Sequence, residues 1–141
     1  MGRKILLITT DQQRYDGLGF AGGRFAKTPV IDKLAADGIV YRQARNQCAV
    51  CMPARCTILT GQHVRMHGVT SNGIALPADH PSVAHALKAA GYKTVLIGKG
   101  HFEPHAAKDF FENKAAGENN FGPHRGYDRM ELAGHTGRAG R

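Results

Sequence analysis

Tryptophan is absent from this sequence of 141 residues, and aromatic residues make up only 7% of it. Basic residues outnumber acidic ones by 19 to 11, which gives a net charge of +8 and favours anionic substrates. The same charge would suit nucleic acid, but the basic residues are scattered and no aromatic stacking platform or recognition helix stands out. We therefore expect a small anionic substrate and no nucleic-acid partner.

Long hydrophobic runs are also lacking. The apolar residues between Lys4 and Asp11 are too few for a signal peptide, and no stretch approaches the length that spans a membrane. The chain contains no internal repeat and no low-complexity tract. These absences predict a protein without a membrane partner, located in the cytoplasm.

Short β-rich runs alternate with amphipathic helical patterns along the chain. The runs expected to be strands are Lys4–Thr10, Ile39–Tyr41 and Tyr92–Ile97. One helix is expected from the cap Thr28 and Pro29 to Gly38, with Val30, Ile31, Leu34 and Ala35 facing inward. Another is expected from Pro81 to Gly91, with Val83, Ala86, Leu87 and Ala90 facing inward. This order predicts an α/β fold with a doubly wound, mostly parallel sheet and helices on both faces.

A further helix start is predicted at Cys51-Met52-Pro53-Ala54-Arg55. Pro53 suits the first turn of a helix, because its missing N–H is not needed there. Arg55 would share a helical face with Cys51. The helix N-terminus would direct its free N–H groups at an anion, and Arg55 would add a permanent positive charge. Taken singly, the same residues also fit a buried cysteine and a surface arginine beside a helix start.

Two polar residues, Asp11 and Gln12, follow the apolar run Lys4–Thr10 directly. Open α/β sheets place ligands just beyond the carboxyl ends of their strands. Asp11 is therefore a candidate oxygen ligand for Ca²⁺ or a similar divalent ion, and Gln12 a candidate for a carbonyl ligand or a substrate contact. A helix-capping aspartate after a core strand is the alternative.

The segment Gly98-Lys99-Gly100-His101 follows another β-rich run. On an extended backbone, the Lys99 and His101 side chains would project the same way. Lys99 would supply a fixed positive charge, and His101 would donate a proton near neutral pH. A solvated loop is the alternative interpretation.

Together these segments resemble the type I sulfatases of the alkaline phosphatase superfamily. The likeness centres on Cys-x-Pro-x-Arg followed by Leu59-Thr60-Gly61, with the Asp-Gln segment before it and the Gly-Lys-x-His segment after it. In that family the cysteine is oxidised to formylglycine, whose hydrate attacks sulfur with one hydroxyl and expels sulfate with the other. The resemblance therefore implies a sulfuric ester hydrolase with formylglycine at position 51.

The resemblance also implies roles, cofactors and partners. The catalytic residues would be Cys51, Arg55, Lys99 and His101, and the substrate-binding residues Asn72 and Gln12. A divalent metal would be held by Asp11 and Cys51, with Ca²⁺ expected and Mn²⁺ or Mg²⁺ as alternatives. The partners would be a small anionic ester and a maturing enzyme, either a formylglycine-generating enzyme or an anaerobic sulfatase-maturing enzyme.

The position of Asn72 resembles the phosphonate monoester hydrolase and choline sulfatase branches, in which an asparagine here faces the substrate. It stands in an Asn-Gly pair, so a plain turn residue is the alternative. The nearby His63 and His67 are expected to be ordinary loop histidines. The departures from the commonest family pattern are Gln12 in place of an aspartate, Gly100 in place of an aromatic residue, Ala54 and Cys56.

The likeness spans nearly the whole chain but only the N-terminal part of the family fold. The family's remaining metal ligands and a second active-site lysine come from later positions. Residues 1–141 are therefore expected to be the N-terminal part of a sulfatase catalytic domain, a truncation with incomplete metal coordination and little activity alone. Residues 102–141 are polar and glycine-rich and are expected to be poorly ordered, although Gly126-Tyr127-Asp128 resembles a Gly-aromatic-Asp segment of the family.

Three alternatives stay open. A phosphonate monoester or phosphodiester hydrolase would use the same nucleophile, because sulfate monoesters and phosphate diesters both present a singly charged tetrahedral centre. Cys48-Ala49-Val50-Cys51 is also the pattern of a redox pair or of half a zinc site, although no second ligand pair has suitable spacing. A non-catalytic remnant of a sulfatase is the third.

Overall fold

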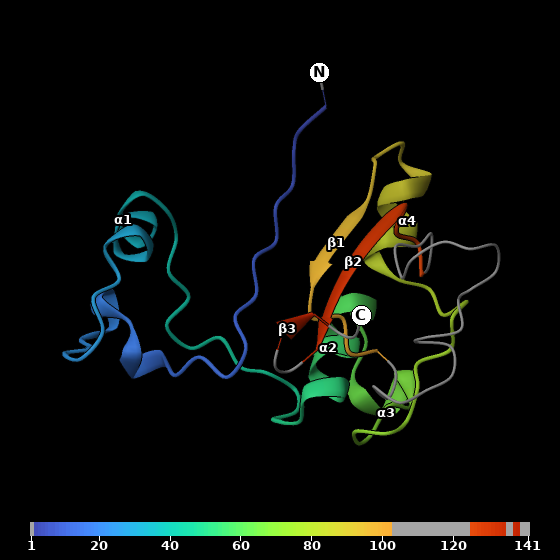
Figure 1. Cartoon of the computed structure of the whole chain (residues 1–141), viewed down its shortest axis with the longest axis horizontal. Helices are drawn as coiled ribbons and strands as arrows, with labels where there is room; N and C mark the ends of the chain where they lie inside the picture. Colours follow the sequence, from blue (N-terminus) through green and yellow to red (C-terminus); the bar gives the residue numbers. More distant parts are fainter. Residues whose placement is uncertain (1, 103–124, 135–136, 139–141) are drawn as a thin grey trace. The chain divides into compact units, whose positions relative to one another are not determined.

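The computed structural model describes residues 2–102, 125–134 and 137–138 (Figure 1). The chain divides into two compact units, Met1–Ala44 and Arg45–Arg141. Among the described residues, the first unit holds one α-helix and two short 3-10 helices, and the second holds three α-helices and three strands.

The elements of the first unit are η1 (Tyr15–Gly17), η2 (Gly19–Ala21) and α1 (Pro29–Asp37). The helix begins and ends where the sequence predicts, between Thr28 and Gly38. Thr28 makes no side-chain cap, however. Its hydroxyl accepts the Gly19 N–H at 2.8 Å and donates to the Asp32 carboxylate at 2.9 Å, which ties η2 to α1.

The predicted strands Lys4–Thr10 and Ile39–Tyr41 are wrong, because neither segment is assigned to a sheet. The side chains from Ile5 to Ile8 are 61–83% exposed, and Val30 and Leu34 of the predicted inward stripe are also exposed. No residue in the described part of this unit is buried. A β-rich run forms a strand only where a neighbouring strand pairs with it, and an apolar stripe is buried only where another element covers it.

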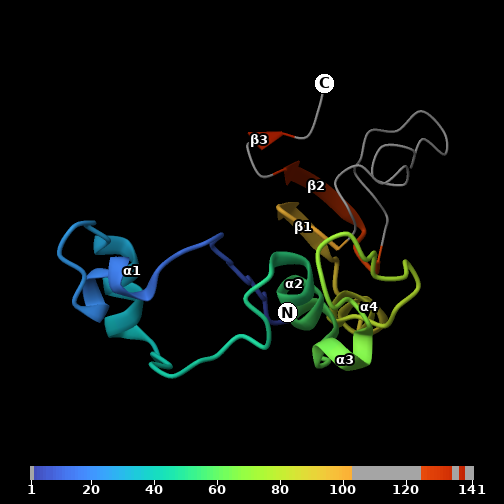
Figure 2. The same cartoon turned by 90° about the horizontal axis from the view of Figure 1, so that it is seen from below.

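The described elements of the second unit are α2 (Cys51–Thr60), α3 (Val64–His67), α4 (Val83–Ala89), β1 (Val95–Gly98), β2 (Arg129–Gly134) and β3 (Gly137–Arg138). The sheet order is β1-β2-β3, with β1 parallel to β2 and β2 antiparallel to β3. Figure 2 shows the three helices on one side of the β1–β2 pair. This α/β arrangement around parallel strands agrees with the predicted fold class. The longest helix in the described ranges has 10 residues. No helix in these ranges is long and apolar enough to cross a membrane.

The predicted strand Tyr92–Ile97 is confirmed as β1, which places Leu96 opposite Met130 of β2. The partner strand lies within residues 102–141, for which the sequence predicts no strand. The prediction that residues 102–141 are poorly ordered falls mostly on residues outside the described ranges. The sheet therefore depends on a pairing that spans more than 30 positions of sequence.

The predicted helix after Pro81 is confirmed as α4. Ser82 caps it, since its hydroxyl accepts the His85 N–H at 3.2 Å. The inward face differs from the predicted one, because Val83 is 47% exposed whereas Ala84 is buried. Leu87 of the predicted stripe is half-buried, whereas Ala86 and Ala90 are exposed, so the predicted face is only partly correct.

The core of the second unit is built on one face of α2. Met52, Cys56 and Leu59 lie on that face at helical spacing and are at most 2% exposed. The cluster also contains Val69, Leu76 and Phe102, with Leu96 and Tyr127 packed against it. Cys56, one of the departures from the family pattern, thus fills the core. Its burial raises the pKa of its thiol to about 11.

The Gly126-Tyr127-Asp128 segment anchors the start of β1. The Thr94 hydroxyl donates to the Gly126 carbonyl at 2.7 Å, and the Thr94 N–H donates to the Asp128 carboxylate at 2.9 Å. The Asp128 N–H donates in return to the Thr94 carbonyl at 2.9 Å. Lys88 of α4 forms an ion pair with Asp128 at 2.7 Å, and Lys88 and Thr94 together lower the pKa of that carboxyl to about 2.

Candidate active site

The predicted nucleophile position, Cys51, is the first residue of α2. Val50 precedes the helix and provides no side-chain cap. Asn72 supplies one from 20 residues away, since its side-chain oxygen accepts the Met52 N–H at 3.0 Å. The Gly73 N–H lies 3.2 Å from the Met52 sulfur, which holds the same turn against the helix. Asn72 is therefore a turn residue that also caps α2.

Sequence reasoning missed this cap, although the sequence carries a signal for it. Helices usually begin with a serine, threonine, aspartate or asparagine at the cap position, and Val50 is none of these. A helix start without its own cap needs an acceptor from elsewhere in the fold. The polar turn at Asn72 is one such source that follows the helix along the chain.

Arg55 connects α2 to the segment that follows β1. Its Nη1 donates to the Lys99 carbonyl at 2.7 Å, across 44 positions of sequence. Arg55 and Cys51 lie one turn apart on α2, as predicted, and both residues are half-buried. The second unit thus brings the cysteine helix and the lysine segment together, an arrangement that the buried-cysteine and surface-arginine alternative does not describe.

The condition of an extended backbone through Lys99 and His101 is not met. β1 ends at Gly98, whose φ is 100°, and His101 has a φ of 55°. Both values are left-handed, and a residue with a Cβ adopts such a φ only where its surroundings hold it. Lys99 is half-buried and His101 is 7% exposed. The two side chains are therefore placed by an irregular segment after β1 instead of by strand alternation.

Gly100 replaces the usual aromatic residue between the lysine and the histidine. It is buried, and a Cβ at this position would lie 3.1 Å from Leu132 Cδ2 and 3.5 Å from the Phe102 ring. A larger side chain would push Leu132 of β2 away from β1. The glycine is thus explained by close packing of this segment on the sheet.

Asp11 and Gln12 lie in the first unit, in an exposed bend where Gln12 has a φ of 53°. Carboxylate and amide oxygens are ligands that Ca²⁺ accepts, so the residue types fit a metal site. Ca²⁺ takes about 6–8 oxygen ligands. Within the described ranges, no three His, Cys, Asp or Glu side chains gather in a group that could hold an ion. Asp11 and Gln12 would therefore supply only part of a coordination shell.

Cys48 and Cys51 are half-buried thiols without a disulfide. The Cys48 sulfur accepts the Val50 N–H at 3.4 Å, in the turn that leads into α2. The part of the chain that the structure describes places no two further ligand side chains with this pair. Cys48 thus stabilises the approach to the helix, and the redox or zinc interpretation stays an alternative.

The prediction that His67 is an ordinary loop histidine is wrong. It belongs to α3 and is only 5% exposed. Its Nε2 lies 3.1 Å from the Thr57 hydroxyl of α2, and its Nδ1 accepts the Val69 N–H at 3.2 Å. No local sequence pattern separates it from the exposed His63, so only the packing of α3 on α2 identifies it.

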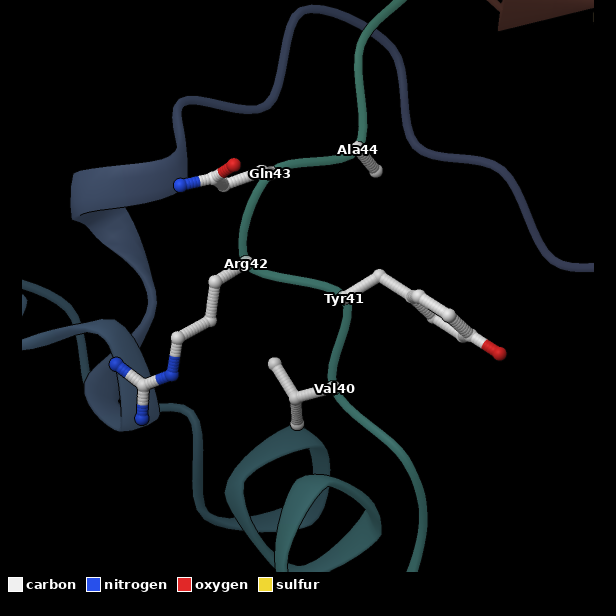
Figure 3. Close-up of a pocket in the computed structure, with 5 residues that line it drawn as sticks. All are labelled: Val40, Tyr41, Arg42, Gln43 and Ala44. Atoms are coloured by element: carbon white, nitrogen blue, oxygen red, sulfur yellow. The ribbon is translucent and has the colours of Figure 1, made fainter.

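A hollow of about 590 Å³ lies in the first unit, lined by Val40, Tyr41, Arg42, Gln43 and Ala44 (Figure 3). These consecutive residues form a turn in which the Ala44 N–H donates to the Tyr41 carbonyl at 3.4 Å. Figure 3 shows the Arg42 and Gln43 side chains on the opposite side of the backbone from the Tyr41 ring. None of the predicted site residues lines this hollow, and we assign it no role.

Residues 3–136 match the model of the sulfatase family. The chain is 38% identical over 101 residues to an ulvan-active sulfatase of Formosa agariphila, which covers 72% of this chain and 20% of that protein. It is 33% identical over 129 residues to an arylsulfatase of Clostridium perfringens, which covers 90% of this chain and 25% of that protein. It is also 38% identical over 101 residues to the multifunctional alkaline phosphatase superfamily protein PehA of Trinickia caryophylli. That match covers 68% of this chain and 20% of PehA.

The chain spans about a fifth to a quarter of the length of these curated relatives. The family match includes α2, with Cys51 and Arg55, and the segment from Lys99 to His101. The sequence motifs and the α/β unit that carries them agree with this match. The chain belongs to the sulfatase family.

Proposed function

We propose that the protein is a sulfuric ester hydrolase that uses a formylglycine derived from Cys51. The observation that carries the proposal is the 2.7 Å bond from Arg55 Nη1 to the Lys99 carbonyl. It joins the helix that begins at Cys51 to the segment that contains Lys99 and His101. Family membership supports the reaction class, and this bond supports one common site for the two segments.

The proposed substrate is a small anionic sulfate ester. A formylglycine hydrate supplies two hydroxyls, one to attack sulfur and one whose loss of a proton expels sulfate and restores the aldehyde. The chain contributes positive charge around this centre, from the N-terminus of α2 and from the Arg55 and Lys99 side chains. These charges offset the negative charge of the sulfate oxygens as the sulfur–oxygen bond to the alcohol breaks.

Each predicted site residue has a proposed role. Arg55 stabilises the side chain at position 51, and Lys99 binds the sulfate oxygens. His101 donates a proton to the oxygen of the leaving alcohol. Asn72 and Gln12 contact the substrate, in addition to the bond that Asn72 makes to α2.

A divalent cation belongs to the proposed site, with Ca²⁺ expected and Mn²⁺ or Mg²⁺ as alternatives. Asp11 would hold it through its carboxylate, together with the side chain at position 51. When bound, such an ion polarises the oxygens of the ester. The roles of Arg55, Lys99 and His101 are assigned independently of it.

For the protein as a whole we propose a doubly wound, mostly parallel sheet with helices on both faces. Maturation of Cys51 requires a formylglycine-generating enzyme or an anaerobic sulfatase-maturing enzyme as a partner. The proposed location is the cytoplasm, without a membrane or nucleic-acid partner. The second unit supports the sheet, since its β1–β2 pair is parallel with helices on one side.

Hydrolysis of phosphonate monoesters or phosphodiesters is the second candidate function. It is favoured by the similarity to a relative named a multifunctional alkaline phosphatase superfamily protein, and by Asn72 beside the first turn of α2. Turnover of an aryl sulfate and of an aryl phosphonate monoester separates the two candidates. Faster sulfate turnover supports the first, and faster phosphonate turnover supports the second.

The mass of the tryptic peptide from Asn46 to Arg55 tests the nucleophile, in protein expressed in its natural host. A mass that matches an aldehyde at Cys51 supports the proposal. An unmodified thiol or a Cys48–Cys51 disulfide supports instead a non-catalytic remnant or a redox or zinc module. The variant Cys48→Ala is the matched control, because it abolishes a redox or zinc role and leaves a sulfatase-type site intact.

A further inference from the structure

His67 is a buried histidine whose two ring nitrogens both have hydrogen-bond partners. The Val69 N–H lies 3.2 Å from Nδ1 and can only donate, so Nδ1 must be an unprotonated acceptor. The neutral ring therefore carries its proton on Nε2. This nitrogen lies 3.1 Å from the Thr57 hydroxyl and donates to it.

The hydrogen bond from Nε2 connects His67 to the helix that carries the candidate site. Thr57 belongs to α2, the helix that begins at Cys51 and carries Arg55. One side chain of α3 thus contacts the middle of α2.

Protonation of His67 is incompatible with this arrangement. A proton on Nδ1 would face the Val69 N–H, and two donors cannot form a hydrogen bond. Burial lowers the pKa of His67, the charges of His80 and His63 act in the same direction, and the Pro53 carbonyl opposes them. The ring is therefore neutral in neutral solution and takes up a proton only below its ordinary pKa of 6.5.

We propose that neutral His67 is a positioning residue for α2. It holds the helix through Thr57. A proton on Nδ1 forces the ring away from the Val69 N–H, and a ring that leaves this position also loses the Thr57 hydroxyl, which releases the helix that carries Cys51 and Arg55. The importance of those two residues rests on the proposed function, whereas the contact of His67 with α2 does not. The consequence is a lower pH limit to the integrity of the site. A residue of α3 sets this limit, at a distance from the reacting atoms.

Nuclear magnetic resonance of the full chain tests the proposal directly. The ring nitrogens of His67 are expected to show the tautomer with its proton on Nε2 and a pKa below the ordinary 6.5. Amide exchange in α2, corrected for its intrinsic pH dependence, should accelerate as His67 titrates. A proton on Nδ1, or α2 protection that does not change through the titration, would overturn the proposal.

Substitutions test the route through Thr57. Thr57→Val keeps the shape but removes the hydroxyl, and should accelerate α2 exchange roughly tenfold, as expected for one lost hydrogen bond. Thr57→Ser should restore protection. Adding His67→Phe to Thr57→Val should change α2 exchange little further, and His63→Phe, at an exposed position, should leave α2 exchange at neutral pH unchanged. Independent effects of the Thr57 and His67 substitutions would contradict the shared bond.

The two proposals fail separately. The tautomer and the exchange of α2 are measured on a chain with an unmodified Cys51 thiol, so they do not require an aldehyde. The peptide mass reports the aldehyde whatever the state of His67. A thiol at Cys51 together with pH-dependent α2 protection would therefore overturn the function and leave the role of His67 in place.

Discussion

Among single residues, burial divides the three cysteines into two kinds. Cys56 packs in the core and its pKa is raised to about 11, whereas Cys48 and Cys51 are half-buried near the start of α2. Only a thiolate is a good nucleophile, so Cys56 is protected both by its packing and by its proton.

We expect iodoacetamide at mildly alkaline pH to modify Cys48, and Cys51 wherever it is still a thiol, but not Cys56. Peptide mass spectrometry of the folded chain measures the three sites. Labelling in denaturant is the control, since all three thiols are then accessible. Equal labelling of Cys56 and Cys48 in the folded chain would show that Cys56 is not a core residue.

Asp128 is expected to make folding sensitive to acid. Its pKa is lowered from 3.8 to about 2 by Lys88 and Thr94, so the folded chain holds this proton more weakly than the unfolded chain. The stabilisation is thus fully present above 3.8 and is lost as the pH falls toward 2. Denaturant unfolding measures this effect. Above pH 3.8, Asp128→Asn should be less stable than the unsubstituted chain, and it should lose less stability as the pH falls toward 2.

Asp37→Asn is the matched control for this prediction. Asp37 forms an exposed ion pair with Lys33 at 2.9 Å, and exposed pairs contribute little to stability. Its substitution should leave the pH dependence of unfolding unchanged. If Asp128→Asn changes the pH dependence as little as Asp37→Asn does, the Lys88–Asp128 pair acts only as a surface ion pair.

At the scale of elements, α2 is held from outside. Asn72 bonds to the Met52 N–H, Arg55 bonds to the Lys99 carbonyl, and His67 bonds to Thr57. The helix has no side-chain cap of its own, and Pro53 removes one N–H from its first turn. The position of its N-terminus therefore depends on loops that are distant in sequence.

Asn72→Ala should lower the free energy of unfolding by about 0.5–2 kcal/mol, as for a lost helix cap. Asn72→Asp should keep most of the stability, because it retains the acceptor and adds a negative charge near a helix N-terminus. Denaturant unfolding measures both variants, with the exposed Thr70→Ala as control. If Asn72→Ala has full stability, its bond to Met52 does not position α2.

Gly126→Ala tests the anchor between α4 and β1. Gly126 has a φ of 88°, and a Cβ there would lie 2.4 Å from the His85 nitrogen of α4. Gly91→Ala is the control, since Gly91 has a φ of 84° with no atom near its missing Cβ. The control should lose about 1–2 kcal/mol from the left-handed backbone alone. Gly126→Ala should lose about 1–3 kcal/mol more through the clash with backbone, and equal losses would contradict the close approach.

At the scale of the whole molecule, the two units differ in burial. The described residues of the second unit include a hydrophobic core, whereas those of the first include no buried residue. The apolar run from Ile5 to Ile8 is largely exposed. Contiguous exposed apolar surface of this kind favours association with other apolar surfaces.

We expect Leu6→Lys and Ile8→Lys to raise solubility and to change the free energy of unfolding by less than about 0.5 kcal/mol, as is usual for surface positions. Leu76→Ala, in the core, should instead lose about 2–5 kcal/mol. Light scattering and denaturant unfolding measure the two properties. A large loss of stability in the lysine variants would show that the run is buried in solution.

The sequence by itself determined the helix ends, one strand and the family. Proline and glycine signals predicted both ends of α1, the region of α4 and the start of α2, because helix ends depend on a few neighbouring residues. The β-rich run before Gly98 predicted β1 for a similar reason. The spacing of Cys51, Arg55, Lys99 and His101 indicated a sulfatase, and the family match agrees.

Only the tertiary structure decided which elements pair and what holds the site. The cap from Asn72, the bond from Arg55 to Lys99 and the burial of His67 join positions 10 to 44 residues apart. The apolar run from Ile5 to Ile8 has strand composition but is paired with no strand among the residues that the structure describes, so composition alone was insufficient. Pairing and capping depend on which groups meet in space, and a local pattern records only what one segment can offer.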